Sequence, residues 1–390
     1  MINLKSIIIA YWLAIISLFL YSYTQVDLNL TLSQWSIWQV IQKSFQYIGW
    51  FNRPLSTAIY IIVLLLLVAC YLLLLWLIRK NKVTIKQFWQ LLIPTSVILL
   101  FSYNAFSYDL FNYMFDARIF TVHSENPYLY KALDYPSDPW INFMRWTHRT
   151  YPYGPVWLVL TVPLSFIGMQ FFLPTLFLYK ALMAISFLGT TYFIGKILEK
   201  ISPANKLFGM ALFALNPLVL IESLVSAHND IVMIFLAVTA LYYLLSNKYV
   251  RAFLLLFLSF GIKFATIVLL PVFLLVVIQR IRKLKTNWRI IFVISLISMV
   301  ISIIPASIRT ELQPWYLLWL LPIVALLSKE KWAVATAVVI PLGLLLHYVP
   351  FLYSGNWDFP ISTIKLWLTI GSIALTTFII ALTKINRDKI

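Results

Sequence analysis

The chain has 390 residues, of which 62% are hydrophobic and only 11% are charged. A soluble domain is closer to half apolar and one quarter charged, so the composition excludes a water-soluble globular protein. The formal net charge of +17 would suit a nucleic-acid-binding protein. However, Lys and Arg lie in short clusters between apolar runs, as signals of membrane orientation do, and we therefore expect no nucleic acid partner.

The apolar runs predict an all-α, polytopic transmembrane helical bundle with about 12–13 spans. A helix needs about 20 residues to cross a bilayer and satisfies its own backbone hydrogen bonds there. No charged linker or low-complexity tract divides the chain, so we expect one transmembrane domain over 1–390. The predicted spans are 6–23, 55–78, 88–104, 171–195, 206–226, 231–247, 250–262, 264–280, 288–305, 314–328, 331–349 and 362–383.

Most Lys and Arg residues fit on one side of this bundle. Cytoplasmic loops are enriched in these residues, so we place the basic clusters and both termini in the cytoplasm. Residues 1–25 lack a small-residue cleavage site and are interpreted as an uncleaved signal anchor. Residues 154–170 could form one more full span, but that would move two basic clusters outside. We expect a re-entrant or steeply tilted helix there instead.

The polar loop 104–155 is then extracytoplasmic, and we predict that it is the catalytic loop. Asp109 comes where the third span leaves the membrane, and Asp116 follows two helical turns later on the same face. Arg118 lies two residues further on, so it faces elsewhere unless the helix breaks. Acidic residues at a membrane boundary are often only solvated, but here carboxylates, guanidinium groups and the segment "YPYGP" occur together.

A second group of polar residues lies in "NPLVLIESLVSAHND", residues 216–230. Glu222 and His228 are six residues apart and need a helix break near Ser226 to meet. Asp230 suits both a ligand contact and the start of the next helix. Lys263 interrupts an apolar region, and a lysine at such depth indicates water or an anion.

A third group lies in "QPWYLLWLLP", residues 313–322. Trp315 and Tyr316 could anchor the helix in the interface or form a sugar-stacking surface, with Gln313 supplying hydrogen bonds. The spacing of His, Asp and Glu matches no metal-binding motif, and Cys70 is the single cysteine. We therefore predict neither a metal site nor a cofactor.

These segments resemble a known family. The segments "DLFNYMFDAR…NPY", "YPYGP", "NPLVLIES…HND", "GIKFATIVLLP" and "QPWYLLWLLP" follow each other between about 100 and 325. In this order they resemble the GT-C superfamily of integral-membrane glycosyltransferases, and within it the polyprenol-phosphate-mannose-dependent mannosyltransferases. The resemblance implies a cavity on the outer face, a sugar donor carried on a polyprenyl phosphate, and metal-independent transfer with inversion. It also implies a base at Asp109, with His228, Asp230, Lys263 and Gln313 lining the same cavity.

The chemistry of such a donor agrees with this implication. A phosphate monoester leaves readily because its second pKa is about 6, so one carboxylate to deprotonate the acceptor hydroxyl suffices. Cations must meet the departing phosphate, and Lys263, Arg118 and His228 are the candidates. The base stays open between Asp109 and Asp116, and the glycan, lipid or protein acceptor is not specified. The alternatives are a lipid-linked polysaccharide polymerase or ligase of the same superfamily, and a multi-span transporter or flippase.

Overall fold

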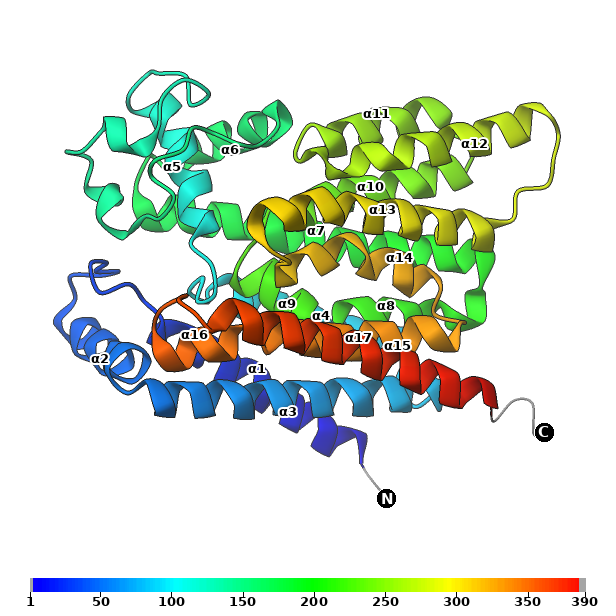
Figure 1. The fold of residues 1–390 in the computed structure, drawn as a ribbon, viewed down its shortest axis with the longest axis horizontal. Helices are drawn as coiled ribbons and strands as arrows, with labels where there is room; N and C mark the ends of the chain where they lie inside the picture. Colours follow the sequence, from blue (N-terminus) through cyan, green and yellow to red (C-terminus); the bar gives the residue numbers. More distant parts are fainter. Residues whose placement is uncertain (1–2, 386–390) are drawn as a thin grey trace.

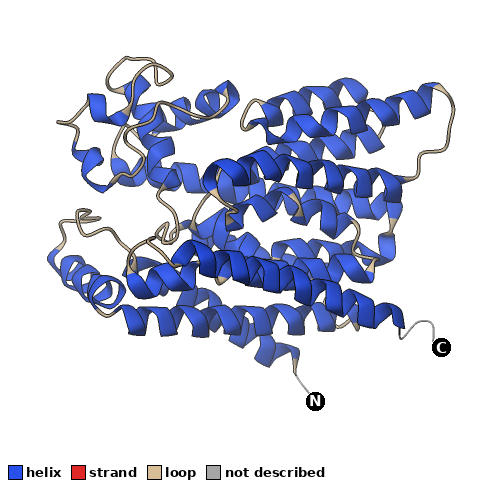
Figure 2. Cartoon of the chain, in the orientation of Figure 1, coloured by secondary structure: helices blue, strands red, loops and turns tan. Residues whose placement is uncertain are grey.

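The computed structural model describes residues 3–385 and confirms the all-helical prediction (Figures 1 and 2). Within the described residues, the only β pairing is one isolated bridge between Lys131 and Thr150. The α-helices are α1 (Leu4–Thr24), α2 (Ser36–Gln46), α3 (Arg53–Arg79), α4 (Ile85–Leu100), α5 (Asp109–Thr121), α6 (Pro155–Ile167), α7 (Phe172–Ile201), α8 (Lys206–Ala214), α9 (Pro217–Leu220), α10 (Asp230–Leu245), α11 (Tyr249–Phe260), α12 (Leu270–Ile281), α13 (Trp288–Thr310), α14 (Leu321–Leu326), α15 (Lys331–Leu345), α16 (Tyr348–Ser354) and α17 (Ile361–Ile385).

The number of complete spans is smaller than expected. Seven helical stretches in the described part are long and apolar enough to cross a membrane, and the bent pair Pro203–Ala214 and Pro217–Val225 would make eight. The twelve predicted runs all coincide with helices. Four of them, however, are the short apolar helices Ile85–Leu100, Asp230–Leu245, Tyr249–Phe260 and Pro314–Leu326. Apolar runs therefore locate helices correctly but overstate how many of them cross the whole bilayer.

Helix α6 follows the large polar loop, where a re-entrant or tilted helix was expected. It has 13 residues, which at about 1.5 Å per residue reach roughly 20 Å. The hydrocarbon core of a bilayer is about 30 Å thick. Its length thus agrees with a helix that enters without crossing.

The long helices lie roughly side by side, and the two ends of the bundle differ in Figure 1. Helix α1 begins and α17 ends at one end, together with the basic turn between α12 and α13. Helices α2, α5 and α16 lie toward the opposite end. The polar loop 104–155 and the basic turns therefore occupy different ends of the bundle.

Helix α2 has its polar residues turned inward. The Gln42 amide donates to the Leu30 carbonyl at 2.7 Å, and the Gln46 amide donates to the Asp27 carbonyl at 3.0 Å. Val40, by contrast, is 67% exposed. Such a face suits contact with lipid better than contact with water.

Lys180 on α7 joins the two chain segments that carry the site. Its side chain is buried, and its ammonium donates to the carbonyl and hydroxyl of Ser102 and to the Val225 carbonyl. Ser102 follows the end of α4, and Val225 ends the π-helical turn η5 (Ile221–Val225). A buried ammonium needs such acceptors, so it holds the two helix ends together.

Candidate active site

Asp109 is the first residue of α5. Its backbone N–H donates to the Ser107 hydroxyl at 3.1 Å, and the partial positive charge of a helix N-terminus favours a carboxylate at this position. The Asp109 side chain remains 17% exposed. Asp109 is therefore held firmly while its carboxylate stays accessible.

The segment between α9 and α10 contains the break that Glu222 and His228 need in order to meet. The π-helical turn η5 ends at Val225, and Ala227 then adopts φ 55°. A left-handed conformation in a non-glycine residue costs about 1–3 kcal/mol and is often found at functional sites. The backbone N–H of His228 donates to the Glu222 carbonyl at 3.0 Å, so the chain turns back on itself.

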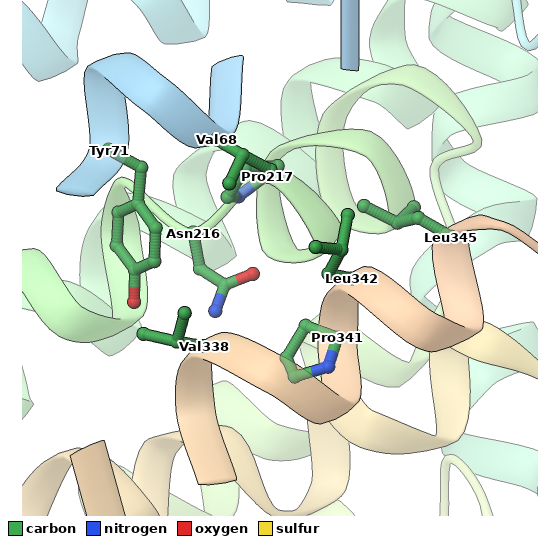
Figure 3. A pocket seen from close by; sticks show the side chains of 8 residues that line it. All are labelled: Val68, Tyr71, Asn216, Pro217, Val338, Pro341, Leu342 and Leu345. Carbon is green, nitrogen blue, oxygen red and sulfur yellow. The ribbon is translucent and has the colours of Figure 1, made fainter. Parts of the chain in front are cut away.

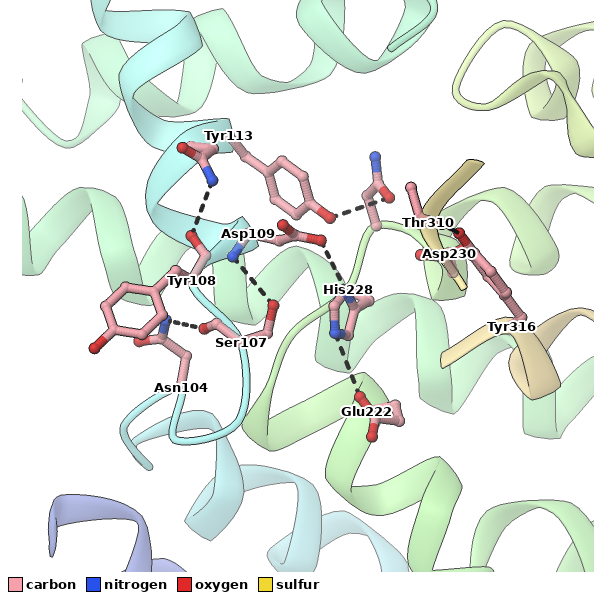
Figure 4. A network of polar contacts seen from close by, with 12 residues as sticks. Asn104, Ser107, Tyr108, Asp109, Tyr113, Glu222, His228, Asp230, Thr310 and Tyr316 are labelled. Atoms are coloured by element: carbon pink, nitrogen blue, oxygen red, sulfur yellow. Dashed lines mark hydrogen bonds and ion pairs between the residues drawn. The ribbon is translucent and has the colours of Figure 1, made fainter. Parts of the chain in front are cut away.

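His228 lies between two carboxylates (Figure 4). Its Nδ1 is 3.5 Å from Asp109 Oδ2, and its Nε2 is 3.3 Å from Glu222 Oε2. The Trp315 ring stacks on the imidazole with 4.1 Å between centroids and 19° between planes. The stacking fixes the ring plane, so each nitrogen faces one acid.

The electrostatics of this pair favour an ionised Asp109 and a protonated His228. Burial alone would lower the pKa of His228, but its contacts with Asp109 and Glu222 outweigh it and raise the pKa to about 9. Burial alone would raise the pKa of Asp109, but His228 and the charges of Arg149 and Lys263 hold it below its ordinary value. At neutral pH the two groups form an ion pair.

Asp230 and Lys263 form a second ion pair beside the first. Lys263 Nζ lies 2.9 and 3.0 Å from the two carboxylate oxygens of Asp230, and the Trp319 indole also donates to Asp230. Asp230 is fully buried, whereas the Lys263 side chain is 23% exposed. The lysine can therefore reach a ligand while the buried Asp230 balances its charge.

The "YPYGP" segment packs directly on the backbone that carries Lys263. The Gly154 N–H donates to the Ile262 carbonyl at 3.0 Å, and the Val156 N–H donates to the Gly261 carbonyl at 2.9 Å. A Cβ atom at Gly154 would collide with the Gly261 carbonyl, so this close approach requires glycine. Two motifs more than a hundred residues apart meet here.

Asp116 also lies on α5, but the carboxylates paired with His228 are those of Asp109 and Glu222. Burial raises the pKa of the Asp116 carboxyl to about 7, although the charge of Arg149 pulls it down. Arg149 is half-buried, and its guanidinium lies 5.8 Å from the Trp146 ring centroid. Near neutral pH Asp116 is partly protonated, so of the two acids Asp109 is the one that is firmly ionised.

Arg118 is engaged elsewhere. Its Nε donates to Asp138 at 2.7 Å, its Nη1 donates to the Gln170 carbonyl at 3.2 Å, and it lies over the Trp140 ring. It therefore braces the loop and is not brought to Asp109. The charges that act on Asp109 are those of His228, Arg149 and Lys263.

The remaining predicted site residues lie around the two ion pairs. The Gln313 amide donates to the Thr310 carbonyl at 2.6 Å. The Tyr316 hydroxyl also contacts the Thr310 hydroxyl, and its ring packs on Trp319. Gln313 thus makes a local bond, whereas Trp315 and Tyr316 reach the site.

Several site residues lacked a sequence signal strong enough to select them. The Tyr348 hydroxyl donates to Glu222 Oε1 at 2.8 Å from 126 residues away, and the Tyr113 hydroxyl donates to Asn229 at 3.3 Å. Arg149 was one of three arginines in the loop, with nothing to single it out. The adjacent "YPYGP" motif was the available clue.

A small cavity elsewhere in the bundle is not a second site (Figure 3). It measures about 10 Å³ and is lined by Val68, Tyr71, Asn216, Pro217, Val338, Pro341, Leu342 and Leu345. The Asn216 amide is already bonded to the Ala337 carbonyl at 2.7 Å. The space suits one water molecule at most.

The fold and this site together define a membrane-embedded enzyme with its polar chemistry gathered at one end of a helical bundle. The chain belongs to a family described as "Alpha-(1->6)-mannopyranosyltransferase, N-terminal domain", whose pattern matches residues 14–279. The protein is thus a mannosyltransferase, as the motifs predicted. None of the curated proteins and none of the solved structures compared with the chain matches it.

Proposed function

We propose that this protein transfers mannose from a polyprenyl-phosphate donor to the 6-hydroxyl of a mannose residue in a glycan acceptor. The linkage follows the family description. The reaction is metal-independent and takes place at the extracytoplasmic face, and Asp109 is the general base. The observation that carries the proposal is the accessible, ionised Asp109 held against His228, at the end of the bundle opposite the basic turns.

The geometry supports a separate role for each oxygen of Asp109. Oδ2 faces His228, so Oδ1 is the oxygen that takes the proton from the acceptor hydroxyl. As that proton moves, the acceptor oxygen bonds to C1 of the mannose, and the bond between C1 and the phosphate oxygen breaks. A single displacement inverts C1, so an α-linked product requires a β-linked donor.

The departing phosphate gains negative charge and needs cations. Lys263 is partly exposed beside Asp230, and Arg149 is a half-buried cation near Asp109 and Asp116. We assign the phosphate to these two residues and leave Arg118 out, because Asp138 already holds its guanidinium. Protonated, buried His228 adds a further positive charge to the site.

The apolar bundle explains how the donor arrives. A polyprenyl tail stays in the bilayer, so an enzyme embedded in the membrane can receive the sugar phosphate sideways. The basic turns favour cytoplasmic termini, which supports an extracytoplasmic position for Asp109. Trp315, Trp319 and Tyr348 lie beyond residues 14–279 yet complete the site, and we propose that 1–390 acts as one domain.

Reconstitution tests this proposal. The purified protein in liposomes is given radiolabelled β-linked polyprenyl-phosphate mannose and an oligomannoside acceptor. We expect labelled product that an α-1,6-specific mannosidase releases, and no product from the α-linked donor. Movement of intact donor across the bilayer without transfer would indicate a transporter, and long polymer products would indicate a polymerase.

A further inference from the structure

Glu222 lies behind His228 in a chain of contacts that starts at the proposed base. Asp109 contacts His228, and His228 contacts Glu222 (Figure 4). The Tyr348 hydroxyl donates to Glu222 at 2.8 Å. These residues come from α5, from the segment 221–230 and from α16. Three separate parts of the chain thus converge on one imidazole and its second acid.

Glu222 cannot itself be the base. Its side chain is fully buried, so an acceptor hydroxyl does not reach it. A buried carboxylate is costly unless it is paired. Among the described residues, the ion pair found for Glu222 is the one with His228, so the two charges depend on each other.

The surroundings of His228 leave its ring with one working orientation. Asp109 faces Nδ1 from α5, Glu222 faces Nε2 from η5, and Trp315 covers one face of the ring from η7 (Pro314–Trp319). The charges of Arg149 and Lys263 also act on Asp109. If the ring turned over, a carbon atom would face each carboxylate, so rotation is disfavoured.

We propose that Glu222, supported by Tyr348, is a positioning residue that keeps His228 charged and oriented, so that Asp109 stays ionised with one oxygen directed to the acceptor. This inference rests on the proposed function. Glu222 exchanges no proton with the substrate; its negative charge balances the imidazolium. The acceptor proton goes to Asp109 and from there to water, and the C1–phosphate bond breaks as described above.

This arrangement predicts how the transfer activity depends on pH. Transfer requires ionised Asp109 and protonated His228, so activity is lost at high pH as His228 loses its proton near pH 9. Without the charge of Glu222, His228 loses one of the two carboxylates that raise its pKa. The alkaline limb of the pH profile should then move to lower pH by about one unit or more.

The test compares the wild type with Glu222→Gln in the reconstituted transfer assay, from about pH 5 to 10. The amide has the same shape and still accepts from Tyr348, but it has no charge. We expect the alkaline limb to move down and kcat to fall about 10- to 100-fold, while KM for the acceptor changes little. Glu222→Asp keeps the charge and should restore the position of the limb.

Asp138→Asn is the matched control. Asp138 is also buried, and its carboxylate also contacts a histidine, His123, at 3.1 Å. It lies in the loop away from Asp109, so its substitution should leave the alkaline limb in place. An equal shift in both variants would overturn the proposal, because burial of any acid would then explain it.

Two further results separate the possible failures. If the wild type transfers mannose and Glu222→Gln has the same alkaline limb and the same kcat as the wild type, the positioning role is wrong and the proposed function stands. If the wild type transfers nothing, the proposed function itself fails. If Glu222→Gln does not fold, the double variant H228Q/E222Q replaces it: activity equal to that of H228Q supports the role, and a further tenfold loss contradicts it.

Discussion

Two polar regions of this molecule use their charges in different ways. In the stretch from α5 to α6, Arg118 pairs with Asp138 and Lys131 pairs with Asp134, and Arg145 pairs with Asp27 in the segment after α1. In the segment 221–230, Glu222 and His228 pair with each other, and His228 and Asp230 also meet Asp109 and Lys263 from other elements. Several buried polar atoms of this segment have no hydrogen-bond partner in the described structure, such as Ser223 Oγ and Ser226 Oγ.

In such a chain, the number of charged residues is a poor guide to the place of the chemistry. The loop has more charged residues than the segment 221–230, but most of them hold the loop in shape. The segment 221–230 has few, yet it places them beside an accessible carboxylate. Buried polar groups usually have hydrogen-bond partners. A buried segment whose polar atoms lack such partners is therefore a stronger sign of function than a loop with many charged residues.

Among the substitutions that separate these two regions, His228→Gln should have the largest effect on transfer and stability. The substitution removes the cation between two carboxylates and leaves Glu222 buried without its partner. We expect transfer to fall about 1,000-fold and the free energy of unfolding to fall by about 3–5 kcal/mol. The radiolabel assay and thermal unfolding in detergent measure the two effects. Near-normal transfer would show that the segment is structural.

A smaller effect should separate the two arginines. Arg149→Gln removes a proposed phosphate contact, so kcat/KM for the donor should fall about 100-fold with little change in stability. Arg118→Gln breaks the brace to Asp138, so stability should fall by about 1–3 kcal/mol, while each folded molecule transfers at a near-normal rate. The reverse pattern would assign the phosphate to Arg118, as the sequence alone suggested.

The pH dependence of stability should also differ between the two regions. The pKa of His228 is raised to about 9 from about 6.5 in an unfolded chain. Its protonation therefore stabilises the fold fully below about pH 6.5, and this contribution disappears as the pH rises through about 9. Melting temperature should fall over this range in the wild type and much less in His228→Gln. Equal slopes would contradict the buried ion pair.

The smallest effect should follow removal of divalent metal ions. The proposal gives the phosphate's charge to Lys263, Arg149 and His228, so EDTA should change the transfer rate by less than about twofold. A metal-depleted sample that regains activity when Mg²⁺ or Mn²⁺ is added would contradict this part of the mechanism.

The sequence predicted the helices better than the spans. Each of the twelve apolar runs lies on a helix, because a membrane-embedded helix must be apolar whatever its length. No run covers α2 or α5. Hydropathy alone does not give the length of a helix: α10 and α11 have 16 and 12 residues and are too short to count as candidate spans. The count of complete spans was therefore too high.

For the site, local patterns located single residues but could not say which would meet. Asp109 stood out because it follows the third predicted span, and Lys263 stood out because it interrupts an apolar region. The Tyr348 contact with Glu222 depends on how α16 packs, which no local pattern encodes. Arg118 was predicted as a phosphate contact and Arg149 was not, and the position of Asp138, which binds Arg118, could not be foreseen from a local pattern.

The central claim is that Asp109 is the base and Asp116 is not. Asp109→Asn and Asp116→Asn keep the size of each side chain and remove its charge, and both are measured by initial rate of mannose transfer in the same liposomes. We predict that the initial rate falls about 1,000-fold or more in Asp109→Asn and that Asp116→Asn retains transfer. Full activity in Asp109→Asn, with loss in Asp116→Asn, would contradict it.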